Sequence, residues 1–443
     1  VISREAPKSL ASASTATVSK ITKKTVSIND LTINCGGVGE GHSGIRLEYN
    51  VGSKVQDVKV DAAEDQGVTV KSSTEVSVVR GAYTNCTSSA TLGNTGYGVA
   101  FLNGTSFSSV KDSYFYNCRH SVSGGGILST WYIDVVGCYS ENSGLATRDF
   151  DCHEPCFYWR FINNTSIAGA DGQGGFVVRG QHILVKGNTI QSVGAGIKVK
   201  TFIVNTDGIS GTTLIGNNII SSSSGISLEG SSADGFLYKT VCSDNKITGT
   251  TFGAVTVLGC HTLSYSGGFI EAAGSKSIDI SSTTFADMSE IHISDVVFGS
   301  STEELVEADF VDGLTLSNLV GTVSMTSVFE INNSRRVQVR GCRAITTESF
   351  LVISDTDEIA VDSCRAEIQA GAGSWDFARI NSTSSNTKVY IRDCQAFGVY
   401  RFGVSTTNYD TIIVTGCDFI DATNATPINL SGAVTTVSDN NLV

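Results

Sequence analysis

The densest group of reactive side chains in this 443-residue chain is the segment 149–156, Asp-Phe-Asp-Cys-His-Glu-Pro-Cys. Carboxylates and an imidazole this close together can exchange protons with a substrate, and crowded titratable groups are associated with active sites. Side chains alternate along an extended strand, so Asp151 and His153 would project to one face and Cys152 to the other. We predict that Asp151, His153 and Glu154, together with Arg179 from a later segment, carry the catalysis.

Two short phrases alternate along most of the chain and must position these groups. One alternates apolar residues and ends in a small residue, as in VSVVRGAYTNC (76–86), VKDSYFYNC (110–118) and VQVRGC (337–342). The other usually opens on glycine, as in GVTVKSS (67–73), GILSTWY (126–132), GFVVRGQ (175–181) and GIKVKTF (196–202). We expect each pair of phrases to form two strands joined by a turn. Judged by the cysteines, the pair recurs every 20 to 32 residues. That period predicts an all-β fold, a right-handed parallel β-helix (a solenoid).

The glycine-led phrases place the reactive segment on a wall of stacked strands. With apolar residues inward, one outward column would run Thr130, His153, Arg179, Lys200 and Glu229. The adjacent column would run Leu128, Asp151, Val177, Lys198 and Ser227. Stacked strands lie ~4.8 Å apart, so the imidazole, the carboxylate and three cations would crowd one face. A stack of like charges is unfavourable unless acids interleave or an anion binds, which indicates a functional surface.

Further side chains near this wall are candidates for binding a substrate. The basic step Arg119-His120 lies one turn earlier, aromatic residues flank the reactive segment, and acids and cations follow it. Aromatic faces beside charged groups suit sugar rings, although the same aromatics would also suit a trimer seam. The predicted substrate-binding residues are Arg119, His120, Trp131, Tyr158, Asp171, Lys198, Lys200 and Glu229.

Composition excludes some classes of function. The net charge of −13 argues against nucleic acid as a partner, because nucleic-acid binding needs a basic field. No run of apolar residues is long enough for a membrane span, so we expect no membrane association. Twelve cysteines are present, and seven end the apolar phrase, so we expect these seven to stack at one corner as core residues of a reduced protein.

A metal site in the reactive segment is disfavoured. The spacing of Cys152, His153, Glu154 and Cys156 lacks the gaps usual for structural zinc. Strand alternation also sends Cys152 and His153 to opposite faces. We therefore expect neither a metal nor another cofactor.

The solenoid phrases, the Arg119-His120 step and Asp151-x-His153-Glu154-Pro155 together resemble bacteriophage tailspike depolymerases with a pectate-lyase-like β-helix. The resemblance covers residues from about 26 to the end, mainly as architecture. It implies a homotrimeric spike of the virion tail that acts outside the host cell. It also implies a bacterial surface polysaccharide, capsule or O-antigen, as the partner and substrate.

Three functions remain open from the sequence. Hydrolysis needs two carboxyl groups, and Asp151 with Glu154, Asp149, Asp171 or Glu229 could supply them; we slightly favour this mechanism. In β-elimination on a uronate, His153 would be the base, and Arg179, Lys198 and Lys200 would neutralise the substrate carboxylate. A non-catalytic adhesin would use the same repeats to bind glycan.

The chain divides by pattern into three regions. We expect residues 1–25 to be an entry segment and 26–276 to form the turns that carry the glycan cleft. Residues 277–443 would continue the solenoid as a stalk or an extended binding wall, because clustered cations are few there.

Overall fold

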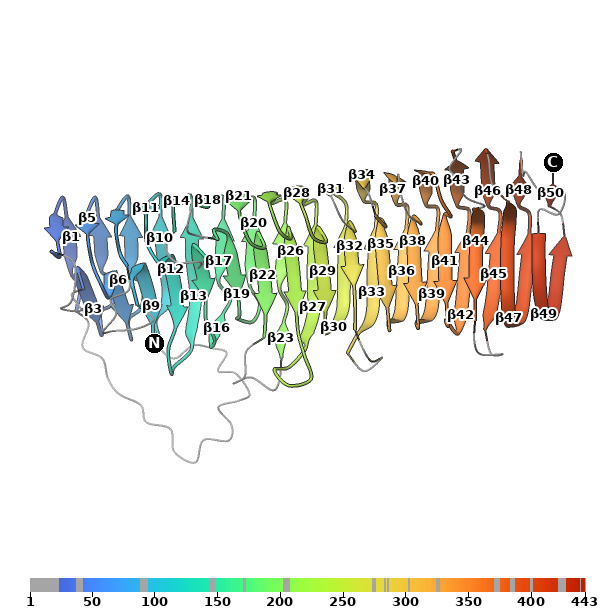
Figure 1. The fold of residues 1–443 in the computed structure, drawn as a ribbon. Coiled ribbons are helices and arrows are strands. Elements are labelled where there is room, and N and C mark those ends of the chain that lie inside the picture. The colour runs from blue at the N-terminus through green and yellow to red at the C-terminus, as the bar shows by residue number, and fades with distance from the viewer. Residues whose placement is uncertain are drawn as a thin grey trace, which may run out of the picture.

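The computed structural model of the chain describes residues 24–36, 43–87, 95–143, 148–169, 173–201, 208–272, 276–282, 284, 287–301, 303–323, 327–369, 375–382, 387–398, 401–420, 428–438 and 440–442. These residues form strands and turns and no α-helix, so no helix among them is long and apolar enough to cross a membrane. The expected entry segment 1–25 lies almost entirely outside this description. The strands stack into an elongated parallel solenoid from β1 to β50 (Figure 1).

Three ladders of parallel strands make the walls of the solenoid, and each ladder receives one strand per turn. The first ladder contains β1 (Ser27–Asn29), β4 (Lys54–Gln56), β7 (Ser77–Val79), β10 (Ser106–Lys111), β13 (Thr130–Val136), β16 (Cys156–Phe157), β17 (Arg160–Ile162), β20 (Leu184–Lys186), β23 (Ile209–Ser210), β24 (Thr213–Ile215), β27 (Leu237–Ser243), β30 (Cys260–Ser266), β33 (Ser289–Ser294), β36 (Asp312–Ser317), β39 (Arg335–Arg340), β42 (Glu358–Asp362) and β45 (Lys388–Arg392).

The second ladder contains β2 (Thr32–Asn34), β5 (Lys59–Asp61), β8 (Ala82–Thr84), β11 (Tyr114–Tyr116), β14 (Tyr139–Glu141), β18 (Thr165–Ile167), β21 (Thr189–Ser192), β25 (Asn218–Ser221), β28 (Lys246–Thr250), β31 (Phe269–Ala272), β34 (Val297–Ser301), β37 (Val320–Val323), β40 (Arg343–Thr346), β43 (Arg365–Ile368), β46 (Gln395–Gly398), β48 (Asp418–Phe419) and β50 (Asn441–Leu442).

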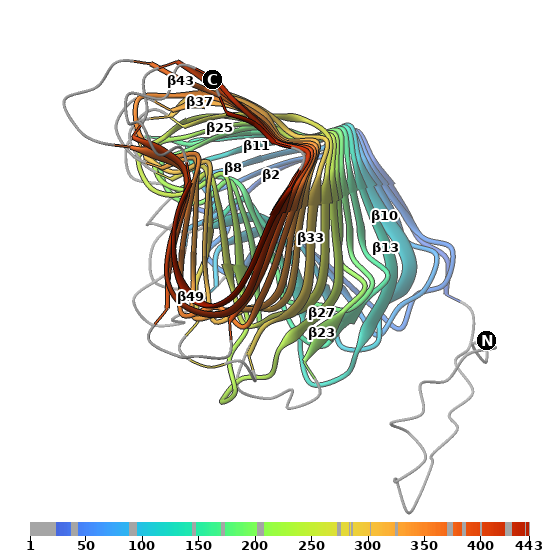
Figure 2. The ribbon, with the colours of Figure 1, turned by 90° about the vertical axis from the view of Figure 1, so that its right-hand side faces the viewer.

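The third ladder contains β3 (Ile45–Glu48), β6 (Gln66–Lys71), β9 (Tyr97–Leu102), β12 (His120–Gly125), β15 (Phe150–Cys152), β19 (Phe176–Val178), β22 (Ile197–Lys200), β26 (Ile226–Glu229), β29 (Val255–Leu258), β32 (Ile278–Ile280), β35 (Val306–Asp309), β38 (Phe329–Asn332), β41 (Leu351–Ser354) and β44 (Asp376–Asn381). The long strands β47 (Phe402–Thr415) and β49 (Ile428–Ser438) bend from the third ladder into the first. End-on, the first and third ladders are two walls that converge at one edge, and the second ladder closes the other side (Figure 2).

The expectation of two strands per turn is wrong, because the apolar phrase itself bends. VSVVRGAYTNC contains both β7 and β8, with Arg80 at φ 51° between them. Gly137, at φ 64°, makes the same corner between β13 and β14. A residue in the left-handed region turns the chain within two positions, so one phrase supplies two walls of the solenoid.

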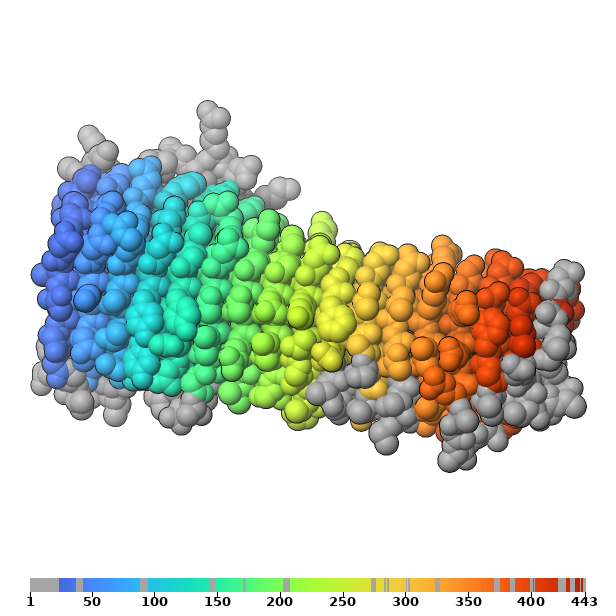
Figure 3. Space-filling model, turned by 90° about the horizontal axis from the view of Figure 1, so that it is seen from above, coloured from blue at the N-terminus to red at the C-terminus, as the bar shows by residue number. Residues whose placement is uncertain are grey.

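The interior confirms the expected inward residues. Phe150, Cys152, Phe176 and Val178 are all buried in one continuous apolar core. Burial of such side chains against the next turn stabilises a solenoid by roughly 25 cal/mol per Å² of apolar surface. Seen from above, the coil is broad over its blue and teal turns and narrower towards the red end (Figure 3).

Polar and thiol side chains share the inner corner between the first and second ladders. Asn164, Asn188, Asn217 and Asn245 stack there, and the Nδ2 of each of the first three donates to the Oδ1 of the next at 2.9–3.0 Å. Each Nδ2 also donates to a backbone carbonyl of the preceding turn, so these buried amides are satisfied.

The twelve cysteines are free, and eleven of them are buried. The expectation that seven of them stack at one corner is wrong, because they divide between two. Cys86 and Cys118 follow strands of the second ladder, whereas Cys138, Cys342, Cys364, Cys394 and Cys417 precede such strands.

The predicted strand 126–132 is also wrong. The third-ladder strand of that turn is β12, and Ser123 pairs with Asp151. Ile127 is 92% exposed, and Thr130 begins β13 of the first ladder. This strand lacks apolar alternation because the Trp159 ring of the next turn occupies the core space beside Gly124. A Cβ atom added to Gly124 would lie 2.2 Å from a carbon of that ring.

Candidate functional site

A buried carboxylate organises the reactive segment on the outer face of the third ladder. Asp151 lies in the middle of β15, and its side chain is only 1% exposed. The Arg179 guanidinium spans it, with Nε 3.3 Å from Oδ1 and Nη2 against Oδ2. His153 Nε2 lies 2.8 Å from the same Oδ2. These three side chains come from β15, the residue just after it and the residue that follows β19, so stacking of the turns brings them together.

His153 and Arg179 present this cluster to solvent. The side chain of His153 is 38% exposed and that of Arg179 is 15% exposed. Arg179 Nη2 also lies 2.7 Å from His153 Nε2. Gly125 is the neighbour of His153 in the preceding turn. A Cβ atom added to Gly125 would lie only 2.8 Å from the Cβ of His153, so a larger residue would not fit. The imidazole therefore stands on an outward column as expected, but its neighbour in the preceding turn is Gly125 and not Thr130.

His120 closes the inner side of the cluster. It begins β12, it is buried, and its Nε2 lies 3.6 Å from Asp151 Oδ2. Its Nδ1 lies 2.6 Å from the Arg148 carbonyl oxygen, so this nitrogen must carry the proton that it donates. Burial lowers the pKa of His120 to about 4, so the ring is neutral at pH 7.

The charge balance fixes Asp151 as a carboxylate. Burial alone would raise the pKa of its carboxyl group, but His153, Arg179 and His120 outweigh burial and lower the pKa below its ordinary value. Asp151 therefore holds and orients Arg179 and His153 and is a poor proton donor at any physiological pH.

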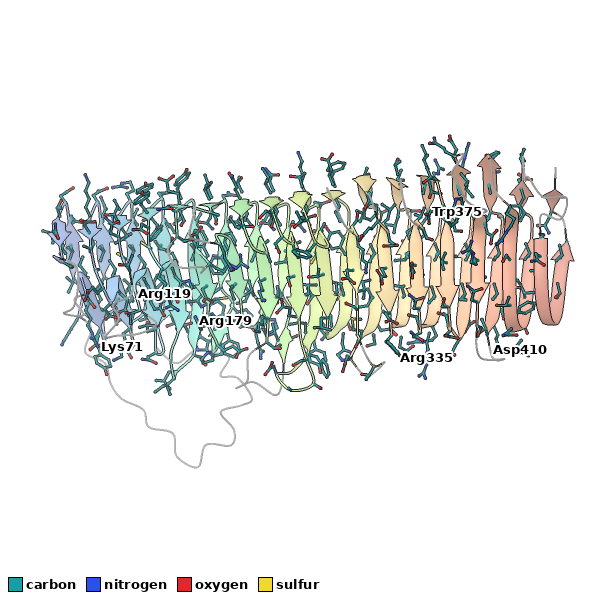
Figure 4. All side chains as sticks on the ribbon, in the orientation of Figure 1. Lys71, Arg119, Arg179, Arg335, Trp375 and Asp410 are labelled. Atoms are coloured by element: carbon teal, nitrogen blue, oxygen red, sulfur yellow. The ribbon has the colours of Figure 1, made fainter. Side chains whose placement is uncertain are left out.

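Arg119 and Tyr97 border the cluster. Arg119 precedes β12, and its Nη1 donates to the Tyr97 hydroxyl at 3.2 Å. The Tyr97 ring lies 5.3 Å from the ring of His120, its partner in the strand register. Sequence analysis missed Tyr97, although its place one turn before His120 was the available signal. Figure 4 labels Arg119 and Arg179 in the N-terminal half of the solenoid.

The column of cations expected after Arg179 is present on the next turn, and the turn after that carries an acid, Glu229. Lys198 and Lys200 lie on β22, and Lys200 is in register with Glu229 of β26. Glu229 forms an ion pair with Lys198 at 2.7 Å and accepts from Ser227 at 2.8 Å. The like-charge stack is therefore partly neutralised by the chain itself.

Other predicted acids are withdrawn from the wall. Asp149 is completely buried and accepts a hydrogen bond from Ser166, and burial raises its pKa to about 6. Both carboxylate oxygens of Glu154 are buried, before a cis bond to Pro155. Asp171 lies outside the described residues.

The predicted aromatic residues lie on the first ladder and not beside Asp151. Trp131 and Phe157 stack with ring centroids 4.2 Å apart. Tyr158 stacks between Tyr132 and His182. Trp159 is fully buried and belongs to the core. A groove of about 600 Å³ runs beside Tyr158, so this groove and the titratable cluster occupy different walls. The cluster on the third ladder brings two histidines and a carboxylate together.

The cluster also has the composition of a metal site. His120, Asp151 and His153 each offer a ligand atom, and these atoms lie within 4.8 Å of one another. However, Arg179 Nη2 lies against both Asp151 Oδ2 and His153 Nε2. The chain thus places its own cation where a metal would bind, which disfavours a metal.

Comparisons with known proteins add no family. No family model matches the chain, and no curated protein matches its sequence. Among solved structures, it is similar to the surface adhesin PfbA of Streptococcus pneumoniae, with a TM-score of 0.40 and 8% identity over 78% of this chain and 82% of that one.

Two further structures are similar at lower scores. One is endo-xylogalacturonan hydrolase from Aspergillus tubingensis, with a TM-score of 0.25 and 12% identity over 92% of each chain. The other is the tailspike receptor binding domain of Siphovirus 9NA, with a TM-score of 0.27 and 8% identity over 93% of this chain and 71% of that one. Scores and identities this low say nothing of what the chain binds or cleaves.

Proposed function

We propose that this chain binds an acidic bacterial surface polysaccharide along the third ladder and cleaves it there. One observation carries the proposal: a buried carboxylate, Asp151, holds an exposed imidazole and a guanidinium side by side on an outer wall. Lys200 follows Arg179 on the same face. A base next to fixed positive charges is the arrangement needed to remove a proton beside a carboxylate.

The reaction that fits best is β-elimination at a uronate. Arg179, with Lys200, would neutralise the uronate carboxylate and so acidify the adjacent C–H bond. His153 would take that proton, through Nδ1, because its Nε2 is turned to Asp151 and Arg179. The electrons of the C–H bond would form a carbon–carbon double bond while the bond to the glycosidic oxygen breaks. The leaving oxygen would then take a proton from His153 or water.

Hydrolysis, which the sequence slightly favoured, is less well supported. It needs a protonated carboxyl group on one side of the bond and a second carboxylate on the other. Asp151 is held ionised by the side chains around it, and Asp149 is buried inside the coil. Glu229 is paired with Lys198, which leaves few acids to act as a proton donor.

We extend the proposal to the biological setting that the sequence phrases suggested. In this setting the chain is a right-handed coil in a homotrimeric tail spike of a phage and meets capsule or O-antigen outside the host cell. Light scattering coupled to gel filtration tests the trimer, and a monomer at micromolar concentration would contradict that part of the proposal.

The experiment for the activity is incubation with capsular polysaccharides that contain uronates, with dextran as a neutral control. β-Elimination would produce new reducing ends together with the ultraviolet absorbance of an unsaturated uronate. His153→Ala should abolish both signals in a folded protein. Reducing ends without absorbance would indicate hydrolysis instead, and binding with neither signal would indicate an adhesin.

A further inference from the structure

A groove on the first ladder is built from side chains that the proposed reaction does not use. It has a volume of about 600 Å³ and is lined by four successive turns. Its lining residues are Phe107, Ser108, Ser109, Lys111, Tyr132, Asp134, Tyr158, Arg160, His182 and Leu184. The first and third ladders are separate walls of the coil, so this groove and the His153 cluster face different sides (Figure 2).

One side of the groove is a ladder of stacked rings. The centroids of Phe107 and Tyr132 are 5.0 Å apart, those of Tyr132 and Tyr158 are 4.9 Å apart, and those of Tyr158 and His182 are 4.8 Å apart. The ring planes differ by only 6–8°. Each ring is fixed by its neighbours, so a ligand would meet a rigid edge and lose little side-chain entropy on binding.

The four residues that carry these rings have a backbone conformation that is unfavourable for most side chains. Phe107, Tyr132, Tyr158 and His182 have φ between 48° and 58°, in the left-handed region. Side chains other than glycine, asparagine and aspartate pay roughly 1–2 kcal/mol there. The same corner carries Gly52 and Gly211 on flanking turns, at φ 68° and 74°, and Glu75, Lys239 and Thr262 at φ 52–62°. The left-handed conformation is therefore a feature of the coil that accepts glycine and other residues, and the four turns of the groove differ from the others in carrying a ring each time.

Beside the rings, the groove is lined mainly by polar side chains. Ser109, Asp134, Arg160 and Leu184 are in register on four neighbouring strands. Arg160 binds Asp134 through two hydrogen bonds of 2.6 Å, and Lys111 lies two positions after Ser109. Paired donors and acceptors in one plane match the vicinal hydroxyl groups of a sugar, whereas the core of an interface between protein copies is depleted in charge.

We propose that this groove is a second glycan-binding site, which holds a short segment of polysaccharide independently of the His153 cluster. Its volume lies within the ~300–1,000 Å³ typical of small-ligand sites. The hydroxyl groups of the sugar would pair with Asp134 and Arg160, and the ring edges would border its apolar surface. The site does not depend on cleavage at the third ladder and would serve to retain the chain on a polymer surface.

The test measures retention of the full chain in gels cast with bacterial capsular polysaccharides. His153→Ala is the background for every variant, so that cleavage cannot obscure binding. Adding Tyr132→Gly and Tyr158→Gly removes two rings while glycine accepts the local φ, so the protein should stay folded by circular dichroism. We expect at least a 10-fold loss of affinity for the polysaccharide that the background variant binds.

Glu75→Gly is the matched control, because Glu75 occupies the same corner at φ 57° but does not line the groove. It should leave retention unchanged. Unchanged retention in the double-ring variant, or no retention of the background variant by any polysaccharide, would overturn the site. A changed oligomeric state with unchanged retention would make this face an interface between copies, which also overturns it. Cleavage is scored separately, so the proposed reaction and this site can fail independently.

Discussion

Two aspartates on the third ladder, Asp151 and Asp376, are both fully buried and bound to arginine. Asp376 begins β44 and receives Arg401, with Nη2 3.0 Å from Oδ2 and Nε 3.3 Å from Oδ1. Arg379 Nε lies 3.4 Å from the same carboxylate, and its guanidinium lies 5.9 Å from the Trp375 ring. Figure 4 labels Trp375 near the C-terminal end, far along the coil from Arg179.

The two clusters differ in histidine. Asp151 is contacted by His153 and His120 as well as by Arg179, whereas the side chains described around Asp376 are arginines and Trp375. Arginine stays charged at every physiological pH, whereas a neutral imidazole has a ring nitrogen that can accept a proton. The comparison teaches that a buried aspartate with arginine can simply fix the wall. In the proposed mechanism the proton is transferred by His153, and Asp151 is a positioning residue.

The largest difference between the two clusters is expected when the exposed side chain of each is removed, His153 in one and Arg401 in the other. His153→Ala should lower the rate of polysaccharide cleavage by 10²–10⁴-fold, the usual contribution of a general base. Arg401→Ala should leave the cleavage rate within about twofold, because the C-terminal cluster lacks a base of this kind. Initial rates of reducing-end formation measure both. Equal losses in the two variants would remove the distinction between the clusters.

Neutralising the two buried carboxylates should give similar losses of stability and different losses of activity. Asp151→Asn and Asp376→Asn each remove a buried carboxylate from arginines that still reach solvent, 15% exposed for Arg179 and 37% for Arg401, so each should cost about 1–3 kcal/mol. Urea denaturation should therefore show lower midpoints for both variants. Only Asp151→Asn should also slow cleavage, because His153 loses the group that orients it. A C-terminal variant that unfolds normally in urea would show that Asp376 contributes little to the wall.

A smaller effect concerns the pH dependence on the N-terminal side. The pKa of His120 is lowered to about 4, so the folded state loses stability as pH falls from about 6.5 towards 4. The pKa of Asp149 is raised to about 6, so the folded state gains stability over nearly the same fall in pH. The two slopes oppose each other in the native chain.

Asp149→Asn removes one of these slopes. The variant should be more stable than the native chain at pH 7 by ~3 kcal/mol and should lose stability more steeply on acidification from pH 6 to 4. Thermal melts across this range measure both effects. Parallel melting profiles for the two proteins would mean that Asp149 is not the opposing group.

Strand alternation was enough to place the outer wall from the sequence. Phe150 and Cys152 are apolar and buried, so Asp151 and His153 had to project outward. The same rule aligned Arg179, Lys200 and Glu229 on later turns. Where each turn repeats the last, a local pattern fixes a tertiary neighbour, because the next strand always stacks in register.

The rule failed where side chains cross between turns. Gly124 and Gly125 lie in a strand without apolar alternation, because Trp159 and His153 from the next turn occupy the space beside them. Asp149 precedes β15 and turns into the coil, which no alternation rule covers. The ring ladder could have been found by aligning the turns on Ser109, Asp134, Arg160 and Leu184, since Phe107, Tyr132, Tyr158 and His182 each stand two positions earlier.

The asparagine stack at the inner corner has a consequence for the lifetime of the wall above it. Asn164, Asn188 and Asn217 each bind the turn before and the turn after, and those turns also carry Arg179, Lys198 and Glu229. Opening one of these turns would break amide contacts on both sides at once, so local fraying should stop at this stretch. Backbone amides here should exchange with deuterium more slowly than those of the thiol-lined turns from Cys342 onward. The charged side chains on these turns would then keep their spacing even when the ends of the coil open transiently.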